Sequence, residues 1–216
     1  MKKILFCFMS FLSGFGAFSQ SNFNKLSFEL ASGFSKPLSN ISSAAESTFM
    51  AAPNWNMGLR YMFNSNFGLK GSFNYDSFEE KGIGSKHNRF NLDAYYNIGN
   101  WFDLNYVSNS SVALYSHLGA GATYINSKVK GLSVGYIPGW ERQINFNIGV
   151  SPRFRMNDIM SLYTDLSYIM AMKQHFNYSG EPIINAGSSG RSGSHFTFSI
   201  GLSFSIGDYD DHADFN

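Results

Sequence analysis

The sequence is poor in charged residues and contains no long apolar run beyond its first twenty residues. Charged residues make up 14% of the 216-residue chain, against roughly 25% in a typical soluble domain. The formal net charge of +1 gives no electrostatic basis for nucleic-acid binding. No later stretch approaches the roughly 18 apolar residues of a membrane-spanning helix. The sequence therefore excludes a polytopic helical membrane protein and disfavours a nucleic-acid-binding protein.

Cysteine is nearly absent, and Cys7 lies in an N-terminal segment with the features of a secretory signal peptide. Two lysines precede an apolar run at 4–18, and small residues at positions 17 and 19 predict cleavage before Gln20. A single membrane-anchor helix is the alternative, but the run is short and interrupted by glycine. A mature chain starting at Gln20 has no cysteine, which excludes disulfides, thiolate metal sites and a catalytic cysteine.

Aromatic residues, by contrast, are abundant. They make up 17% of the chain, with 22 Phe and 12 Tyr. The mean hydropathy is nevertheless −0.17, because Ser, Asn and Gly dilute the apolar residues. So many aromatic side chains argue against intrinsic disorder. Transmembrane β-strands, which are apolar at every second residue, account for this combination.

Apolar residues recur with period two in eight segments, which is the pattern of β-strands with one apolar face. Each segment is about as long as the 9–11 residues that a tilted transmembrane strand needs. Eight is also the smallest usual strand number of an outer-membrane barrel. The apolar faces begin at Leu26, Trp55, Phe67, Phe90, Val112, Ile144, Leu162 and Phe196.

The connections between the segments alternate in length. Tight polar turns are expected at 64–66 and 156–158, and longer segments rich in Gly, Ser and Asn at 35–52, 78–85, 126–140 and 173–192. Short periplasmic turns and long external loops are typical of outer-membrane barrels. The aromatic segment 100–110 is long for a turn, so we expect it either to extend two strands or to lie at the membrane interface.

The sequence thus predicts an all-β protein, an eight-stranded antiparallel up-and-down transmembrane β-barrel. Residues 1–19 are assigned to the signal peptide, 20–207 to the barrel and 208–216 to an acidic periplasmic tail. A soluble secreted β-domain is the alternative, since period two does not tell which face points outward. The apolar face carries almost no charge, as lipid contact requires, and this favours the membrane barrel.

The last segment and two others resemble a known family. The last segment contains the residues of a C-terminal β-signal, the pattern that the barrel-assembly machinery of the outer membrane reads. The mature chain as a whole resembles the OmpA-like eight-stranded outer-membrane β-barrel family, and segments 114–121 and 144–178 resemble that family in particular. The proposed signal residues are Ser199, Gly201, Phe204 and Ile206.

The resemblance implies a location in the outer membrane of a Gram-negative cell, with both termini in the periplasm. The expected partners of the protein are outer-membrane lipid and, during insertion, the barrel-assembly machinery. Another outer-membrane protein complex is kept as an alternative partner. The resemblance covers the barrel domain; the peptidoglycan-binding domain of larger family members has no counterpart here, so a wall-anchoring role is not implied.

Charges of both signs lie on the polar face, which the barrel would enclose. An eight-stranded barrel is only just wide enough for its side chains, and buried charges persist only when they are paired. We therefore predict that three arginines pair across the lumen with Glu29, Asp93 and Asp165. The predicted network consists of Glu29, Arg60, Lys70, Arg89, Asp93, Arg153 and Asp165, with Lys25 and Asp76 on the same face.

The sequence gives little support for catalysis or for a cofactor. Ser116 and His117 are adjacent and so face opposite sides of a strand, and no acidic residue follows His195 in its strand. We therefore expect no enzyme and no cofactor. In the tail, a solvated segment is favoured over a metal site, because nothing fixes the ligand geometry. The tail residues in question are Asp208, Asp210, Asp211, His212 and Asp214.

The sequence is compatible with two main functions. The first is a structural or interaction role for a barrel whose lumen is plugged by paired charges. The second is a narrow pore for small solutes, and a lipid-modifying barrel enzyme comes third.

Overall fold

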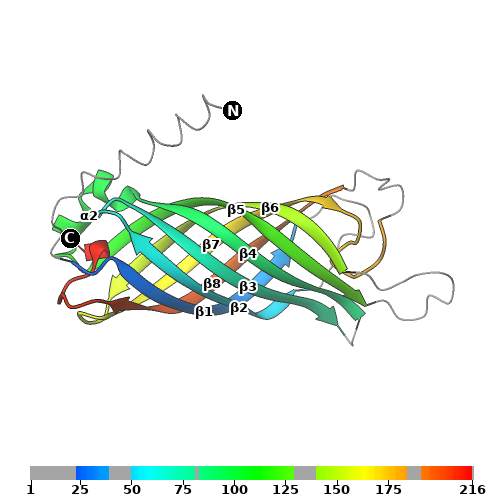
Figure 1. Cartoon of the computed structure of the whole chain (residues 1–216), viewed down its shortest axis with the longest axis horizontal. Helices are drawn as coiled ribbons and strands as arrows, with labels where there is room; N and C mark the ends of the chain where they lie inside the picture. The colour runs from blue at the N-terminus through cyan, green and yellow to red at the C-terminus, as the bar shows by residue number, and fades with distance from the viewer. Residues whose placement is uncertain (1–22, 39–49, 81–82, 129–139, 184–190, 216) are drawn as a thin grey trace, which may run out of the picture.

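The computed structural model describes residues 23–38, 50–80, 83–128, 140–183 and 191–215; the proposed signal peptide lies outside this part of the chain. Eight strands form one closed antiparallel barrel in chain order, and the last strand pairs with the first (Figure 1). The predicted fold class is confirmed. The strands are β1 (Leu26–Pro37), β2 (Ala51–Met62), β3 (Phe67–Glu80), β4 (Ile83–Asn97), β5 (Val112–Lys128), β6 (Trp140–Arg155), β7 (Met160–Gln174) and β8 (Arg191–Ile206).

The two ends of the barrel differ. At one end, here called the terminal end, lie the C-terminus and the β4–β5 connection with its short helix α2 (Leu104–Val107) (Figure 1). The β2–β3 and β6–β7 turns belong to the same end, and the opposite end is called the loop end. Asn64 shapes the first of these turns, because its side-chain oxygen accepts hydrogen bonds from the backbone N–H groups of Asn66 and Phe67.

The strands are longer than the sequence pattern predicted. The prediction of a loop at 78–85 is wrong, because β3 continues to Glu80 and β4 begins at Ile83. The longest strand, β5, has 17 residues. At about 3.3 Å per residue, such strands extend beyond the height of roughly 25 Å of a lipid-facing apolar band. Beyond the apolar band, two neighbouring strands need only backbone hydrogen bonds to stay paired. Polar and glycine-rich residues near a turn therefore do not end the strands.

The β4–β5 connection contains the short 3₁₀-helix η3 (Ile98–Phe102) as well as α2. The expectation that segment 100–110 extends two strands is therefore wrong. Its aromatic side chains point outward, and Trp101 and Tyr106 are 69% and 90% exposed. A place for this segment at a membrane interface stays a prediction.

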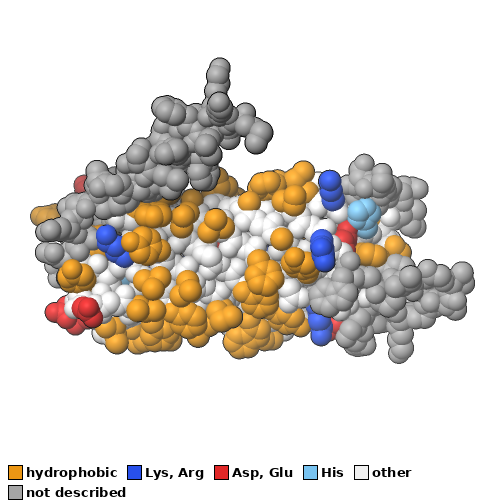
Figure 2. Space-filling model, in the orientation of Figure 1, with side chains coloured by type: hydrophobic (Ala, Val, Ile, Leu, Met, Phe, Trp, Pro, Cys, Tyr) orange, Lys and Arg blue, Asp and Glu red, His pale blue; other side chains and the backbone are white. Residues whose placement is uncertain are grey.

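Side chains alternate between the inside and the outside of the barrel, as period two requires. In β8, Phe196 and Ile200 are exposed, whereas Thr197 and Ser199 are buried. Figure 2 shows hydrophobic side chains spread over the barrel wall, while the charged side chains in view gather toward its two ends. Within the described residues, no helix is long and apolar enough to cross a membrane.

Candidate functional site

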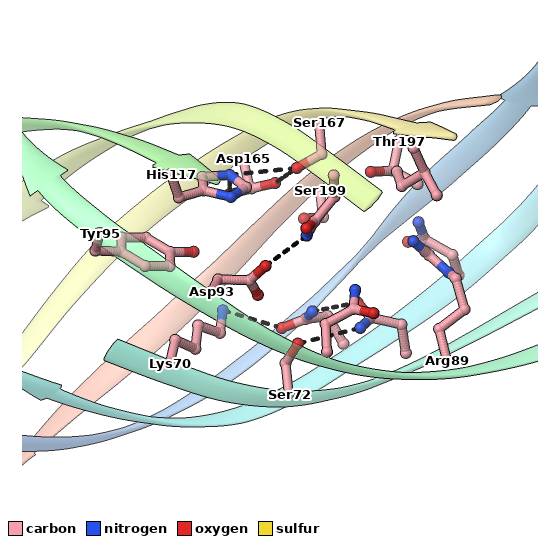
Figure 3. Close-up of a pocket in the computed structure, with 16 residues that line it drawn as sticks. Lys70, Ser72, Arg89, Asp93, Tyr95, His117, Asp165, Ser167, Thr197 and Ser199 are labelled. Carbon is pink, nitrogen blue, oxygen red and sulfur yellow. Dashed lines mark hydrogen bonds and ion pairs between the residues drawn. The ribbon is translucent and has the colours of Figure 1, made fainter. Parts of the chain in front are cut away.

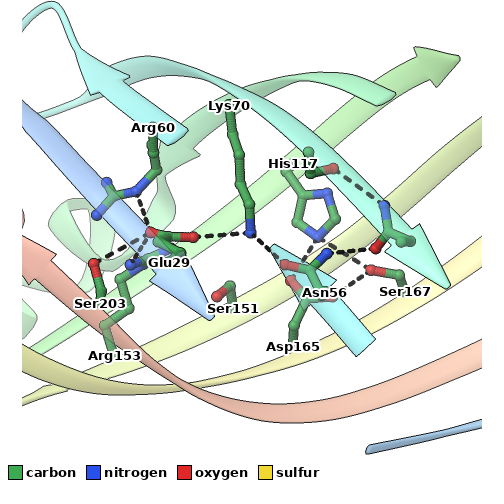
Figure 4. Close-up of polar contacts among 12 residues, drawn as sticks. Glu29, Asn56, Arg60, Lys70, His117, Ser151, Arg153, Asp165, Ser167 and Ser203 are labelled. Atoms are coloured by element: carbon green, nitrogen blue, oxygen red, sulfur yellow. Dashed lines mark hydrogen bonds and ion pairs between the residues drawn. The ribbon is translucent and has the colours of Figure 1, made fainter. Parts of the chain in front are cut away.

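Three cations surround the carboxylate of Glu29 near the terminal end of the lumen. The side chains come from four different strands, β1, β2, β3 and β6, whose polar faces point inward (Figure 4). Arg60 Nε donates a hydrogen bond of 2.8 Å to Glu29 Oε1. Lys70 Nζ lies 2.8 Å from Glu29 Oε2, and Arg153 Nη1 lies 2.7 Å from Glu29 Oε1. All four side chains are buried.

A second carboxylate reaches this cluster from beyond the barrel strands. Asp214 lies in the 3₁₀-helix η4 (Ala213–Phe215), and its two oxygens accept hydrogen bonds of 2.7 and 2.6 Å from Arg60 Nη1 and Nη2. Arg153 Nη1 lies 3.7 Å from the same carboxylate. The expectation of a solvated tail is therefore wrong for residues 212–215, which are buried. The ion pair between Asp214 and Arg60 and the apolar contacts of Phe215 hold them against the barrel end.

Asn24 attaches the segment that carries Asp214. Its backbone N–H donates to Asp211 O at 2.8 Å, and its backbone oxygen accepts from Ala213 N–H at 3.3 Å. Its side chain bonds to both backbone groups of Tyr209, at 2.6 and 3.1 Å. The chain reverses at Gly207, where φ is 154° and a Cβ atom would collide with the Asn24 side chain. Asn24 and Gly207 thus direct η4 into the mouth of the lumen.

Tyrosine rings line the cation cluster. The Arg153 guanidinium lies 4.9 Å from the centroid of the Tyr163 ring, and Arg60 lies 5.4 Å from that of Tyr115. Lys70 Nζ lies 5.3 Å from the Tyr163 centroid. Ring faces attract cations without adding a formal negative charge. The cluster therefore holds three cations with two carboxylates and a set of aromatic faces.

The middle of the lumen holds smaller polar contacts. Asp165 Oδ2 lies 3.1 Å from His117 Nε2, and Ser167 Oγ lies 3.3 Å from the same nitrogen. Asp93 accepts a hydrogen bond of 2.6 Å from Asn147. These groups line a cavity of about 30 Å³ (Figure 3), room for about two water molecules.

Near the loop end, an ion pair spans two neighbouring strands. Arg89 Nε and Nη2 of β4 lie 3.0 and 2.8 Å from Asp76 Oδ2 of β3. The other oxygen of Asp76 accepts a hydrogen bond of 2.5 Å from Ser35, which in turn accepts one of 2.9 Å from Asn54. Both carboxylate oxygens of Asp76 are therefore satisfied, although the residue is fully buried.

Above this pair, Tyr178 of the β7–β8 connection packs into the lumen. Its ring stacks on His87 at a centroid distance of 5.2 Å and meets Phe78 edge-on at 4.9 Å. Its hydroxyl shares a hydrogen bond of 3.0 Å with His195 Nδ1, and its backbone oxygen accepts one from Ser85. Burial raises the pKa of the Tyr178 phenol, so the hydroxyl stays protonated. Side chains thus occupy the lumen at both ends.

The structure brings four of the seven network residues together and separates the others. Glu29, Arg60, Lys70 and Arg153 form one cluster. Arg89 pairs with Asp76, which the sequence analysis placed on the same face but outside the network. Asp93 and Asp165 contact an asparagine and a histidine in place of the expected arginines.

Asp214 and Tyr178 were not among the predicted lumen residues, because both lie outside the alternating segments. Neither residue carries a periodic signal that would place it.

The four proposed signal residues lie in β8, with Ser199 and Gly201 on the inner face and Phe204 and Ile206 on the outer face. Ser199 is 7% exposed and lines the lumen, whereas Ile206 is 49% exposed on the outer face. Phe204 pairs with Phe28 on one side and with Met160 on the other. Gly201 lies opposite Ala31, where a Cβ atom would collide with β1.

Two solved outer-membrane proteins have a similar fold. Neisserial surface protein A (NspA) superposes with a TM-score of 0.59 at 11% identity, covering 86% of this chain and 98% of that chain. A major outer membrane protein from Thermus thermophilus gives a TM-score of 0.53 at 10% identity, covering 84% and 98%. At such identities the likeness shows the fold alone, an outer-membrane type of β-barrel. No family model and no curated protein matches the sequence.

Proposed function

We propose that this protein is an integral outer-membrane β-barrel of the OmpA-like type, with a structural or interaction role and a lumen closed by paired charges. Both termini face the periplasm in this proposal, and the loop end faces outward. The observation that carries it is the filling of the lumen from both ends, by Arg60, Glu29 and Asp214 at one end and by Tyr178 with Asp76 at the other.

Energetics support a closed lumen. A solute crossing the barrel has to separate charges that are held at 2.6–2.8 Å. Leaving one member of a buried pair without its partner costs about 3–5 kcal/mol. Several such pairs lie in the terminal cluster, which consists of Glu29, Arg60, Lys70, Arg153 and Asp214. The central cavity has a volume of about 30 Å³, which is room for water but not for a solute.

A narrow pore is the second candidate. One observation favours it: the central cavity is lined by polar side chains and can hold water. A pore would require Tyr178 and the terminal cluster to move apart together.

The geometry gives less support to a lipid-modifying enzyme. Ser167 and Asp165 both contact Nε2 of His117, whereas a nucleophile–base relay needs the serine and the acid on opposite ring nitrogens. In the described part of the chain, His117 Nδ1 has no hydrogen-bond partner. These side chains also face the lumen and not the lipid.

Conductance in planar lipid bilayers tests the closed lumen. We expect the wild-type protein to give no steady conductance. Tyr178→Ala and Arg89→Ala each weaken the loop end and should give brief openings at most, because the terminal cluster remains. A stable, reproducible single-channel conductance of the wild type, with ion selectivity changed by Arg89→Ala, would favour the pore.

Cell fractionation tests the location. We expect the mature protein in the outer membrane, as a form that migrates differently on gels before and after boiling. An epitope added after Asn216 should stay inaccessible to antibody in intact cells and become accessible after the outer membrane is permeabilised. Recovery in the soluble periplasm, or labelling of the epitope on intact cells, would contradict the proposal.

A further inference from the structure

The barrel strands leave the terminal cluster with an excess of positive charge. Arg60, Lys70 and Arg153 face one carboxylate from the strands, that of Glu29. Glu29 Oε1 already contacts Nε of Arg60 and Nη1 of Arg153, and Glu29 Oε2 contacts Nζ of Lys70. The outer edge of Arg60, formed by Nη1 and Nη2, therefore turns away from the strands and toward Asp214.

This edge has the geometry of a carboxylate receptor. Two parallel N–H donors of one guanidinium match the two oxygens of a carboxylate, which is the strongest arrangement that arginine offers. Arg153, at 3.7 Å from the same carboxylate, adds a second positive charge. The site is fully buried, so water screens the attraction little.

The residue that fills the receptor is not part of the barrel wall. β8 ends at Ile206, and Asp214 reaches the cluster through η4. The segment is attached to Asn24 by backbone and side-chain hydrogen bonds and by the packing of Phe215 near Met62, Tyr95 and Tyr115. It can leave without breaking any strand pair of the barrel.

We propose that Arg60 and Arg153 form a carboxylate-binding site at the terminal end of the lumen. Asp214 occupies this site as an internal ligand, and a small external carboxylate can take its place. The ligand class follows from the donors: a planar anion with two coplanar oxygens, small enough to fit between Arg60 and Arg153. The proposal holds whether or not the lumen conducts.

Chemical rescue of Asp214→Ala tests the proposal. The substitution removes one carboxylate and leaves a space of about the size of formate. In the folded full-length variant in detergent, we expect a lower midpoint temperature for conversion from the compact to the unfolded gel form. Sodium formate should raise this midpoint toward the wild-type value along a saturable curve. Acetate should act more weakly because of its methyl group, and sodium chloride of equal ionic strength should not restore the midpoint.

Two variants serve as controls. Asp214→Asn keeps the side-chain size, so its amide blocks the site, and its lowered midpoint should not respond to formate. Asp211→Ala removes a carboxylate of the same segment that is 47% exposed and pairs with Arg155. Its midpoint should stay near the wild-type value and should not respond to formate.

Formate rescue confined to Asp214→Ala supports the site. Equal effects of formate and chloride on that variant, or equal effects of formate on all variants, would overturn it. Where Asp214→Ala does not fold unaided, refolding from urea is compared in formate and in chloride. Folding in formate alone supports the proposal, and folding in neither salt overturns it.

Discussion

Glu29 Oε1 lies 2.7 Å from Arg153 Nη1 and accepts a hydrogen bond of 2.8 Å from Arg60 at the same time. One carboxylate oxygen thus serves two guanidinium groups from different strands, while the second oxygen faces Lys70. No other side chain of the strands supplies a carboxylate to this cluster within the described residues. The stability of the barrel should therefore depend strongly on Glu29.

Glu29→Gln should destabilise the barrel by about 3–5 kcal/mol. The amide keeps the size of the side chain but leaves three buried cations with the carboxylate of Asp214 alone. Urea unfolding of the detergent-folded protein, followed by tryptophan fluorescence, measures the change. The matched control is Glu79→Gln, which breaks a partly exposed pair with Lys86 and should cost about 0–1 kcal/mol. Equal losses for the two variants would contradict the central role of Glu29.

The Arg89–Asp76 pair should behave as a coupled unit. Arg89→Ala leaves the carboxylate of Asp76 buried and should destabilise the barrel by about 3–5 kcal/mol, less if water enters. The double variant Arg89→Ala/Asp76→Ala removes both charges and should be more stable than Arg89→Ala alone. The same unfolding measurement on all four proteins of this cycle gives the coupling energy. Additive losses would show that the pair contributes no net interaction.

The strand pattern predicted the barrel because lipid and lumen impose opposite polarity on alternate residues. The same alternation placed Glu29, Arg60 and Arg153 on the inner face, where they meet. It could not tell how far each residue lies along the barrel axis, and this distance decides which charges pair. Adding charges over the whole lumen therefore hid the local excess of cations at the terminal end.

Asp214 shows why the remainder of the site was out of reach. It closely follows Asp208, Asp210 and Asp211, an acidic composition that is typical of a solvated segment. Its burial depends on the geometry of Arg60, 154 positions earlier in the chain. Pairing over such a distance leaves no local signal, and the same holds for Tyr178, which reaches His87 from a connection between strands.

Phe204→Asp should prevent assembly of the barrel. The substitution places a carboxylate on the outer face of β8 and also disrupts the proposed β-signal. A charge on the lipid face costs up to a few kcal/mol near the midplane of the membrane, with acidic residues less costly than basic ones. We expect loss of the heat-modifiable form and degradation of the chain in cells. The control Tyr209→Asp alters a half-exposed residue after the strand and should accumulate normally, whereas normal accumulation of Phe204→Asp would refute the outward assignment.

The contribution of Asp214 to stability should depend on pH in one direction. Burial disfavours the charged form of this carboxylate, but the positive charge of Arg60, aided by His212 and Arg153, outweighs burial and holds the pKa of Asp214 well below its ordinary value. A group whose pKa is lowered by folding stabilises the protein fully above its unfolded pKa, about 3.9 for aspartate. That stabilisation is lost as the pH falls further, through the folded pKa.

The difference in unfolding free energy between the wild type and Asp214→Asn isolates this effect, because asparagine does not titrate. Both proteins share every other lumen carboxylate, so the contributions of Glu29 and Asp76 largely cancel. We expect a difference that does not shrink from neutral pH down to about pH 5 and that shrinks below about pH 4. A difference that already shrinks between neutral pH and pH 5 would mean that folding raises the pKa of Asp214. In that case burial would dominate, and the pairing with Arg60 would not hold the segment in the lumen at neutral pH.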